Sequence, residues 1–254
     1  MLLLCDIGNT HTHLAWATTQ RVVRHRDLPT GGVLDGSALA GIRAFAQDRP
    51  PAGVALCSVV PRATRALLPF LRRTWRRPVL ELGPHTVTGV GIDYPRPHTI
   101  GPDRLANAIA AAHCYGAPVV VVDFGTAVTF DVVNRRKNYV GGIIAPGLAA
   151  MTDYLHEKTA LLPRIRIRET RRVVGRSTRE AMLVGAVHGY RGLVRELIHE
   201  LRRELKCPEL PVVATGGCAA LIARGLPEIT TVNPLLTLEG LRLAWLAWNA
   251  AEGS

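Results

Sequence analysis

Two stretches of the chain share one pattern of apolar and polar positions. Residues 119–133 read VVVVDFGTAVTFDVV, and residues 2–16 read LLLCDIGNTHTHLAW. In each, an apolar run that favours a buried strand leads to Asp-x-Gly and a polar residue, which favour a tight turn. Loosely alternating positions then predict a returning strand. The pattern therefore predicts the same strand-turn-strand unit twice, with Asp6 and Asp123 at corresponding places.

Alternating helices and strands follow each predicted hairpin. In the first half we expect a third strand over residues 20–26, helices over 37–47, 62–75 and 102–115, strands over 53–59 and 79–82, and an ordered loop over 83–100. In the second half we expect strands over 138–144 and 211–214, and helices over 148–160, 178–204, 218–224 and 233–249. Gly116-Ala117-Pro118 breaks the chain between the halves. This order predicts two α/β lobes, 1–115 and 116–254, that face each other across a cleft.

The composition is that of a globular chain. Hydrophobic residues make up 48% of the 254 residues, which is enough for a substantial core. No apolar run approaches the ~18–20 residues of a membrane helix, so we expect no membrane association. The N-terminus lacks a basic segment, and Asp6 interrupts its apolar run, so it does not resemble a signal peptide. The five Cys show no C-x-x-C spacing, which favours a reduced, cytoplasmic protein.

The chain is strongly basic, with 31 Lys and Arg against 20 Asp and Glu and a net charge of +11. A nucleic-acid partner is one interpretation of this charge. The other is that it is spread over solvated faces, and we favour it because the Arg residues lie along several predicted helices. Aromatic residues are 5% of the chain, few for stacking on bases. We therefore expect no nucleic-acid partner, although an anionic small substrate could use part of the charge.

Both predicted turns are suited to phosphate, but neither has a known nucleotide-binding motif. No Lys follows a Gly, which excludes the Walker form, and no complete G-x-G-x-x-G is present. A nucleotide could instead be held between the two hairpin tips, where Asp6 and Asp123 would face its phosphates with hard cations between them. The groups that would touch phosphate oxygens are then Gly8, Asn9, Thr10, Gly125 and Thr126.

Asp103 and Arg104 follow Gly101-Pro102 at the predicted start of a helix, where free N–H groups and the positive end of the dipole meet. Asp103 could be an ordinary first-turn acid and Arg104 a surface cation. The presence of two phosphate-type turns in the same chain strengthens the functional interpretation of both residues. Asp103 would accept a proton from an attacking hydroxyl, and Arg104 would bind a carboxylate.

Three further groups have weaker interpretations. Residues 141–147 and Thr215-Gly216-Gly217 are either simple turns or places where a base or ribose can lie without steric conflict. His11 and His13 share one face of a predicted strand, but no third ligand is evident, so we do not expect them to bind metal.

In order along the chain, these motifs resemble those of type III pantothenate kinases. The positions that carry the resemblance are Asp6-Ile7-Gly8-Asn9-Thr10, Tyr94 with Pro97, Gly101-Pro102-Asp103-Arg104, residues 123–129, Gly141-Gly142 with Pro146-Gly147-Leu148, Leu162-Pro163, Thr178, Thr215-Gly216-Gly217 and Leu238-Glu239-Gly240-Leu241. The family belongs to the acetate and sugar kinase, Hsp70 and actin superfamily. The resemblance therefore implies two similar lobes of the actin-like ATPase (ribonuclease H-like) fold, facing across a nucleotide cleft.

The resemblance also implies an activity: ATP-dependent phosphorylation of the primary hydroxyl of pantothenate to 4'-phosphopantothenate, the first step to coenzyme A. It implies Asp103 as the general base and Asp123 as the ligand of a monovalent cation, potassium or ammonium. Mg²⁺ would accompany ATP, and the chain would form a homodimer. The implied pantothenate contacts are Tyr94, Gly101, Pro102, Asp103, Arg104 and Thr178. The implied ATP contacts are Asp6, Ile7, Gly8, Asn9, Thr10, His11, Thr12, His13 and Thr126.

Two positions depart from the family pattern. His13 stands where many members carry Lys or an apolar residue, and Arg96 stands where Asn often precedes the Pro. Neither is the implied base, so the departures bear on the affinity for ATP rather than on the reaction. Two alternatives stay open: another small-molecule kinase of the same superfamily, and a non-catalytic paralogue that acts as an accessory or regulatory protein.

Overall fold

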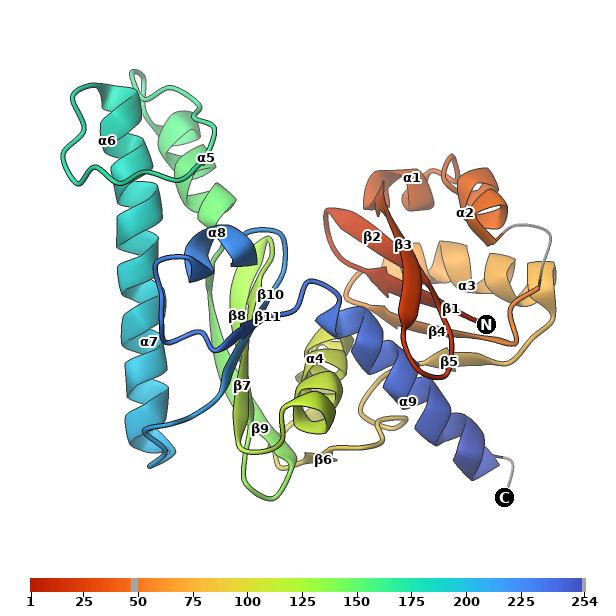
Figure 1. Ribbon diagram of the computed structural model, residues 1–254. Helices are drawn as coiled ribbons and strands as arrows, with labels where there is room; N and C mark the ends of the chain where they lie inside the picture. Colours follow the sequence, from red (N-terminus) through yellow and green to blue (C-terminus); the bar gives the residue numbers. More distant parts are fainter. Residues whose placement is uncertain (47–49, 253–254) are drawn as a thin grey trace. The chain divides into compact units, whose positions relative to one another are not determined.

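The structure is a computed structural model that describes residues 1–46 and 50–252 (Figure 1). Its contacts divide the chain into two compact units. Unit 1 comprises residues 1–117, 135–141 and 235–254, and unit 2 comprises residues 118–134 and 142–234. The predicted division into lobes 1–115 and 116–254 stays a prediction.

Unit 1 contains a five-stranded sheet of order β3-β2-β1-β4-β5. The strands are β1 (Leu2–Ile7), β2 (His11–Ala17), β3 (Val22–Pro29), β4 (Gly53–Ser58) and β5 (Val79–Glu81). β1, β2 and β3 pair antiparallel, whereas β4 pairs parallel with both β1 and β5. The first predicted hairpin is thus confirmed. The apolar run of β1 is explained by its central place in a sheet that is covered on both faces.

The helices of unit 1 are α1 (Thr30–Leu34), α2 (Leu39–Ala46), α3 (Pro61–Trp75), α4 (Pro102–Cys114) and α9 (Leu236–Glu252). The helix predicted over 37–47 corresponds to α2, but its last residue, Gln47, lies outside the described residues. A hydrophobic core packs α2 and α3 against the sheet through Ile42, Leu67, Leu14 and Leu56, all fully buried. Burial of such side chains is the main stabilising term in a sheet-and-helix layer.

Helices α4 and α9 lie side by side in unit 1, although they are far apart in the sequence (Figure 1). A Cβ added at Gly240 would lie 1.9 Å from the carbonyl oxygen of Ala106, so only glycine allows this approach. Thr237 Oγ1 donates a hydrogen bond of 2.8 Å to Asn107 Oδ1 across the same contact. The close packing holds the last helix against the one that carries Asp103.

The second sheet has the order β11-β10-β7-β8-β9 over the five strands that correspond to those of unit 1, and a sixth strand, β6 (Gly91–Ile92), continues it beside β9. Its strands are β7 (Val119–Phe124), β8 (Ala127–Val133), β9 (Asn138–Pro146), β10 (Val212–Thr215) and β11 (Thr231–Val232). β7 pairs antiparallel with β8 and parallel with β10, which in turn pairs parallel with β11. The first residues of β9 belong to unit 1, where they pair with β6 (Gly91–Ile92).

Burial follows the same pattern along β1 and β7. Each strand begins with four buried residues, continues with a half-buried Asp (Asp6 in β1, Asp123 in β7) and ends with one more buried residue. The returning strands β2 and β8 have the same burial class at every position after the first. The predicted repeat of one strand-turn-strand unit is therefore confirmed, and the α/β class with it.

The helices of unit 2 are α5 (Leu148–Lys158), α6 (Thr178–Val184), α7 (Tyr190–Glu204) and α8 (Ala219–Ala223). The single helix predicted over residues 178–204 is wrong in one respect. A π-helical segment, η2 (Gly185–Gly189), joins α6 to α7. Glycine at both ends of this segment lowers helix propensity, and widened turns of this kind occur as single insertions within α-helices.

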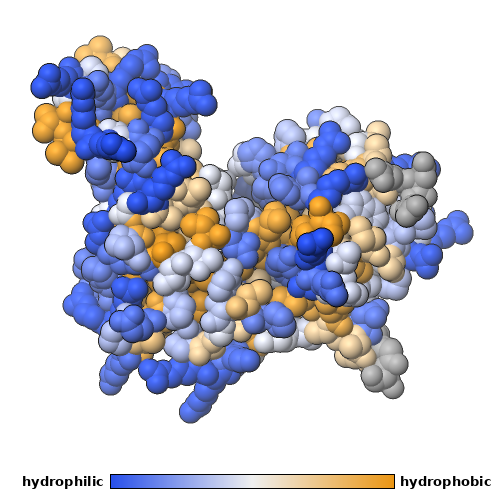
Figure 2. All heavy atoms as spheres, viewed as in Figure 1, coloured by the Kyte–Doolittle hydropathy of each residue, from blue (hydrophilic) through white to orange (hydrophobic). Residues whose placement is uncertain are grey.

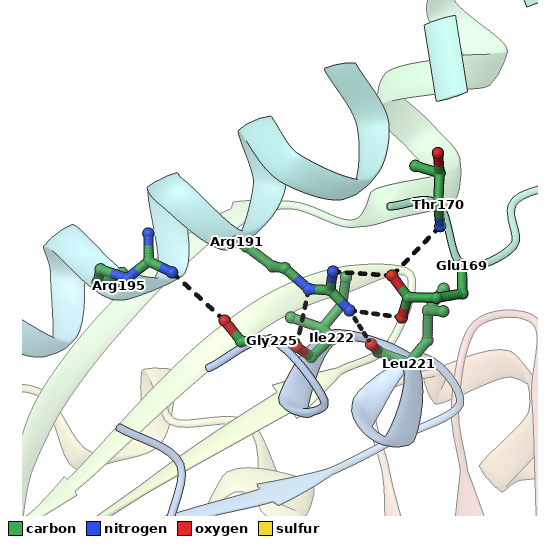
Figure 3. A network of polar contacts seen from close by, with 7 residues as sticks. All are labelled: Glu169, Thr170, Arg191, Arg195, Leu221, Ile222 and Gly225. Carbon is green, nitrogen blue, oxygen red and sulfur yellow. Dashed lines mark hydrogen bonds and ion pairs between the residues drawn. The ribbon is translucent and has the colours of Figure 1, made fainter. Parts of the chain in front are cut away.

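A polar cluster joins three segments of unit 2 (Figure 3). The guanidinium of Arg191 in α7 makes two hydrogen bonds, of 2.9 and 2.7 Å, to the carboxylate of Glu169. It also donates to the carbonyl oxygens of Leu221 and Ile222 near the end of α8, at 2.7 and 3.2 Å. Because Arg191 is buried and Glu169 lies in the irregular segment 159–177, this cluster holds that segment and α8 to α7.

Four short elements were not predicted. The turn region before residue 37 contains α1, the loop over 83–100 contains β6 and the 3₁₀ turn η1 (Pro97–Thr99), and β11 adds an edge strand. Each is two to five residues long and has no room for a hydrophobic period. Among the described residues, no helix has the length and apolar character required to span a bilayer.

Candidate active site

The turn after β1 is closed by its own backbone and braced by α1. The backbone N–H of Gly8 donates to the carbonyl oxygen of His11 at 2.9 Å. Thr30, the first residue of α1, donates its hydroxyl to the Gly8 carbonyl at 2.7 Å and its N–H to the Thr10 carbonyl at 3.0 Å. Asn9 and Thr10 remain exposed at the tip. The turn thus presents its polar tip to solvent on a fixed backbone, as a phosphate contact requires.

Asp6 lies beside Cys57, its register partner on the parallel strand β4. The thiol of Cys57 donates a hydrogen bond of 3.2 Å to Oδ1 of Asp6. Burial, together with the negative charges of Asp6 and Asp103, raises the pKa of the Cys57 thiol well above its ordinary value of 9.0. Because both carboxylates act on one buried thiol, unit 1 brings two of the predicted site residues, Asp6 and Asp103, to the same end of β4.

Asp103 occupies the first turn of α4, after the extended N-cap Gly101 and Pro102. Its Oδ1 accepts the backbone N–H of Arg104 at 2.8 Å. A Cβ added at Gly101 would lie 2.5 Å from that Oδ1, so glycine leaves room for the carboxylate. Desolvation raises the pKa of Asp103 above its ordinary 3.8, although the N–H and the charge of Arg104 oppose the rise. A half-buried carboxylate with a raised pKa is suited to accept a proton.

Tyr94 and Arg104, both predicted to contact pantothenate, meet at Tyr139. The rings of Tyr94 and Tyr139 are 6.1 Å apart in an edge arrangement, and the Arg104 guanidinium lies 5.7 Å from the Tyr139 ring centroid. Gly141 packs on Tyr94: a Cβ there would lie 3.5 Å from the Tyr94 ring, and its φ of +130° favours glycine. An aromatic wall beside a guanidinium can hold an apolar chain that ends in a carboxylate.

In unit 2 the turn after β7 is packed against two glycines. Gly216 has a φ of +88°, and a Cβ there would lie 2.5 Å from Oδ1 of Asp123. A Cβ at Gly147 would lie 2.2 Å from the carbonyl oxygen of Thr126. Thr126 and Gly125 are exposed at the tip, and Asp123 is half-buried. The unit therefore has a second glycine turn, closely packed and with exposed oxygen-bearing groups, at the place that corresponds to the turn after Asp6.

The structure also places the remaining predicted site residues. Thr178 is the first residue of α6 and is exposed. Ser177 caps that helix by accepting the Glu180 N–H at 3.2 Å. His13 Nδ1 lies 2.7 Å from Oδ1 of Asp27 on β3, and the exposed His11 ring is 6.3 Å from the His13 ring. The residues that the structure describes contain no group of three His, Cys, Asp or Glu arranged to hold a metal.

Three residues of the site were missed by sequence reasoning: Thr30, Cys57 and Tyr139. Each joins the site through strand register or loop packing rather than through its own motif. For Cys57, one signal was available, since β4 is the predicted strand that follows the first hairpin and corresponds to β10, where Thr215-Gly216-Gly217 was noticed.

The glycine pair after β10 allows a direct test of the packing around Asp123. We expect Gly216→Ala to weaken nucleotide binding and to cost about 1–3 kcal/mol of stability, because the left-handed φ and the contact with Asp123 both oppose a side chain. Gly217→Ala is the matched control, since a Cβ there meets nothing within 4 Å. Titration calorimetry with ATP and urea unfolding measure the two effects. Equal results for the two variants would show that the Gly216 contact has no role.

Two mixed sheets of corresponding order, each with a half-buried Asp before a glycine turn, define a two-lobed α/β protein of the actin-like ATPase and sugar kinase fold. The comparisons give the family. A family model described as type III pantothenate kinase matches residues 2–200. A type III pantothenate kinase of Akkermansia muciniphila is 50% identical over 248 residues, which cover 95% of this chain and 97% of that protein. The chain belongs to the type III pantothenate kinase family.

Solved structures agree on the fold. A Campylobacter jejuni protein described as of the Baf family superposes with a TM-score of 0.63 at 19% identity, covering 98% of this chain and 99% of the other. An inorganic polyphosphate/ATP-glucomannokinase of Arthrobacter superposes with a TM-score of 0.50 at 16% identity, covering 98% of both chains. The predicted fold, the predicted family and the prediction of a kinase are thereby confirmed. The roles of individual residues stay predictions.

Proposed function

We propose that this chain transfers the γ-phosphoryl group of ATP to the primary hydroxyl of pantothenate, which yields 4'-phosphopantothenate at the start of coenzyme A biosynthesis. Membership in the family supports the substrates. The single observation that carries the proposal is the half-buried Asp103 carboxylate at the start of α4, where desolvation raises its pKa and where its charge, like that of Asp6, acts on the Cys57 thiol. A carboxylate poised in this way is what a kinase that acts on an alcohol requires.

The proposed reaction is an in-line displacement. The pantothenate hydroxyl oxygen forms a bond to the γ-phosphorus, the bond from that phosphorus to the β,γ-bridging oxygen breaks, and ADP leaves with the electron pair. The hydroxyl proton passes to a carboxylate oxygen of Asp103, late in the transfer. Because phosphoryl transfer depends mainly on alignment and charge, the protein has little else to do than hold both substrates.

Pantothenate carries a carboxylate, two hydroxyls and an amide on a short apolar frame. We assign Arg104 to its carboxylate and Tyr94 to its apolar face, since Tyr139 brings these two side chains together. The backbone of Gly101 and Pro102 would lie next to the substrate, near Asp103. Thr178 of unit 2 is the remaining proposed contact.

ATP contacts are proposed in each unit. In unit 1 they are residues 6–13, where the fixed turn at Gly8 exposes Asn9 and Thr10. In unit 2 the proposed contact is Thr126. Carboxylate and hydroxyl oxygens at both turns are donors that Mg²⁺ accepts, so the residues present fit the divalent metal that accompanies ATP in this family. When bound, Mg²⁺ neutralises phosphate charge.

Asp123 is proposed to bind a monovalent cation, potassium or ammonium. A single half-buried carboxylate against the backbone of Gly216 is suited to an ion of low charge. We expect replacement of potassium by sodium to lower the activity several-fold, and Asp123→Asn to abolish the difference between the two salts. Initial rates in matched chloride buffers measure this. Equal rates in both salts for the unchanged protein would contradict the assignment.

A coupled assay of ADP release with a panel of acceptors tests the proposed function itself. Pantothenate is expected to be turned over much faster than glucose, acetate or glycerol. A preference for another acceptor would favour the alternative of a different small-molecule kinase, and no ADP release with any acceptor would favour the non-catalytic paralogue.

We also propose that the chain is a cytoplasmic homodimer. Large apolar side chains are exposed in unit 2, at Tyr154, Leu155, Leu161, Val173 and Val174. Figure 2 shows apolar atoms among strongly hydrophilic ones over the end of unit 2 that carries α5 and α6. Exposed apolar groups of this kind are common at contacts between chains. The sedimentation mass distinguishes a dimer from a monomer.

A further inference from the structure

The two units place similar side chains beside their aspartates. In unit 1 the parallel register of β1 and β4 sets Asp6 opposite Cys57. In unit 2 the parallel register of β7 and β10 sets Asp123 opposite Thr215. Both neighbours are buried, Cys57 fully and Thr215 to 2% exposure. Each unit therefore has a buried thiol or hydroxyl at the same register position, next to the half-buried carboxylate of its first strand.

The contact in unit 1 has a defined direction. The group that faces an ionised carboxylate must donate the hydrogen bond, because an ionised carboxylate only accepts hydrogen bonds. The Cys57 thiol does so, with Sγ 3.2 Å from Oδ1 of Asp6. A buried cysteine more often acts as a small apolar side chain that fills space. Here the sulfur instead faces a charged oxygen at the edge of the core, which packing alone does not require.

We propose that Cys57 is a positioning residue for the reaction. Its thiol holds the carboxylate of Asp6 in one orientation at the end of β1, so that the other carboxylate oxygen is presented toward the nucleotide. Thr215 occupies the matching place in unit 2. This inference rests on the proposed contact of Asp6 with ATP and adds a residue to which that proposal gives no role.

The experiment compares donors and non-donors at position 57. Cys57→Ala is expected to raise the KM for ATP about fivefold to tenfold, with a smaller change in kcat and none in the KM for pantothenate, because a modest hydrogen bond to a charged group is lost. Cys57→Ser, which restores a donor, is expected to stay within about twofold of the unchanged protein. Binding of ATP measured by calorimetry should follow the same order.

A second pair of variants covers the case in which alanine disturbs folding. Thr and Val have nearly the same shape, so Cys57→Thr and Cys57→Val differ mainly in the hydroxyl donor. We expect tighter ATP binding for the Thr variant. Cys5→Ala is the packing control: this fully buried thiol lies on β1, and its loss should lower the melting temperature without changing the KM for ATP.

Two results would overturn the proposal for Cys57: an unchanged KM for ATP in Cys57→Ala, or equal binding by the donor and non-donor variants. Asp6→Asn separates this failure from a failure of the proposed function. If Asp6→Asn weakens ATP binding while the position-57 variants do not, Cys57 is merely structural. If Asp6→Asn also binds ATP normally, the assignment of Asp6 itself is wrong.

Discussion

Replacement of Asp103 by Asn is expected to lower kcat about 10²–10⁴-fold while the KM for pantothenate stays nearly unchanged. Asn keeps the size of the side chain, and its amide oxygen can still accept the Arg104 N–H that Asp103 Oδ1 accepts in the structure. It cannot take a proton from the substrate hydroxyl. The effect therefore falls on the chemical step, and single-turnover rates at saturating ATP and pantothenate measure it.

The pH profile gives a second test of the same residue. Desolvation raises the pKa of Asp103 above 3.8, so kcat/KM should fall as the pH drops through that raised value and the base becomes protonated. The Asn variant should lack this acidic limb. Asp35→Asn, which makes the same change at an exposed carboxylate outside the proposed site, is the control and should leave both rate and profile unchanged. A normal kcat in Asp103→Asn would remove the general base from the mechanism.

Stability distinguishes a lost base from a damaged fold. Since the pKa of Asp103 is higher in the folded than in the unfolded chain, the folded state binds more protons between the two values, and stability falls as the pH rises through that window. At neutral pH the ionised Asp103 is thus a cost to folding. The Asn variant should unfold at the same urea concentration or a higher one, which would exclude unfolding as the cause of its low activity.

The elements with a long apolar period could be predicted from the sequence. The hairpins at residues 2–17 and 119–133 were predicted because a continuous buried run followed by Asp and Gly admits few other structures. The π-helical segment η2 was not, since a widened turn leaves the apolar period almost unchanged. The packing of α9 on α4 also could not be inferred, because it depends on the absence of a side chain at Gly240, far along the chain.

The candidate site was predictable where one short motif carries it. Asp103 and Arg104 stand together after Gly101-Pro102, and their place at the start of a helix follows from that order. Tyr139 and Cys57 have no such motif. Cys57 reaches the site through the register of β4 with β1. Tyr139 reaches it because the first residues of β9 pair with β6. Both pairings join positions that are distant in the sequence. Register between separate strands is set by tertiary packing rather than by local pattern.

The cluster around Arg191 carries the largest expected effect on stability (Figure 3). The Arg191 side chain is 8% exposed, and its guanidinium makes hydrogen bonds to three groups. The carboxylate of Glu169 supplies the only opposite charge that the described residues place on it within 4 Å. Replacing Glu169 by Ala leaves a buried cation with two carbonyl partners and no counter-charge. We expect the free energy of unfolding to fall by about 2–4 kcal/mol, less than for a pair buried on both sides, because Glu169 is 34% exposed and water can reach the place that it leaves.

Arg191→Met tests the cluster from the other side. Glu169 is 34% exposed and can be hydrated, so the loss here is mainly that of the α8 carbonyl partners, and we expect about 2–3 kcal/mol. The double variant should be more stable than the sum of the two losses predicts, because its second change removes a group that the first left unpaired. Arg203→Met is the control on the same helix: its side chain is 68% exposed, its partners Glu196 and Glu200 are exposed as well, and its loss should cost at most about 1 kcal/mol.

The dependence on pH identifies the charge pair as the cause. The hydrogen bonds and charge of Arg191 lower the pKa of Glu169 below its ordinary 4.5. The stability that this pair contributes is fully present above pH 4.5 and is lost as the pH falls through the lowered pKa. The cause is that Glu169 binds a proton at a higher pH in the unfolded chain than in the folded one. Urea unfolding between neutral and acidic pH should show this loss in the unchanged protein and not in Arg191→Met. The same acid dependence in both would mean that other carboxylates, and not this pair, hold the irregular segment 159–177 in place.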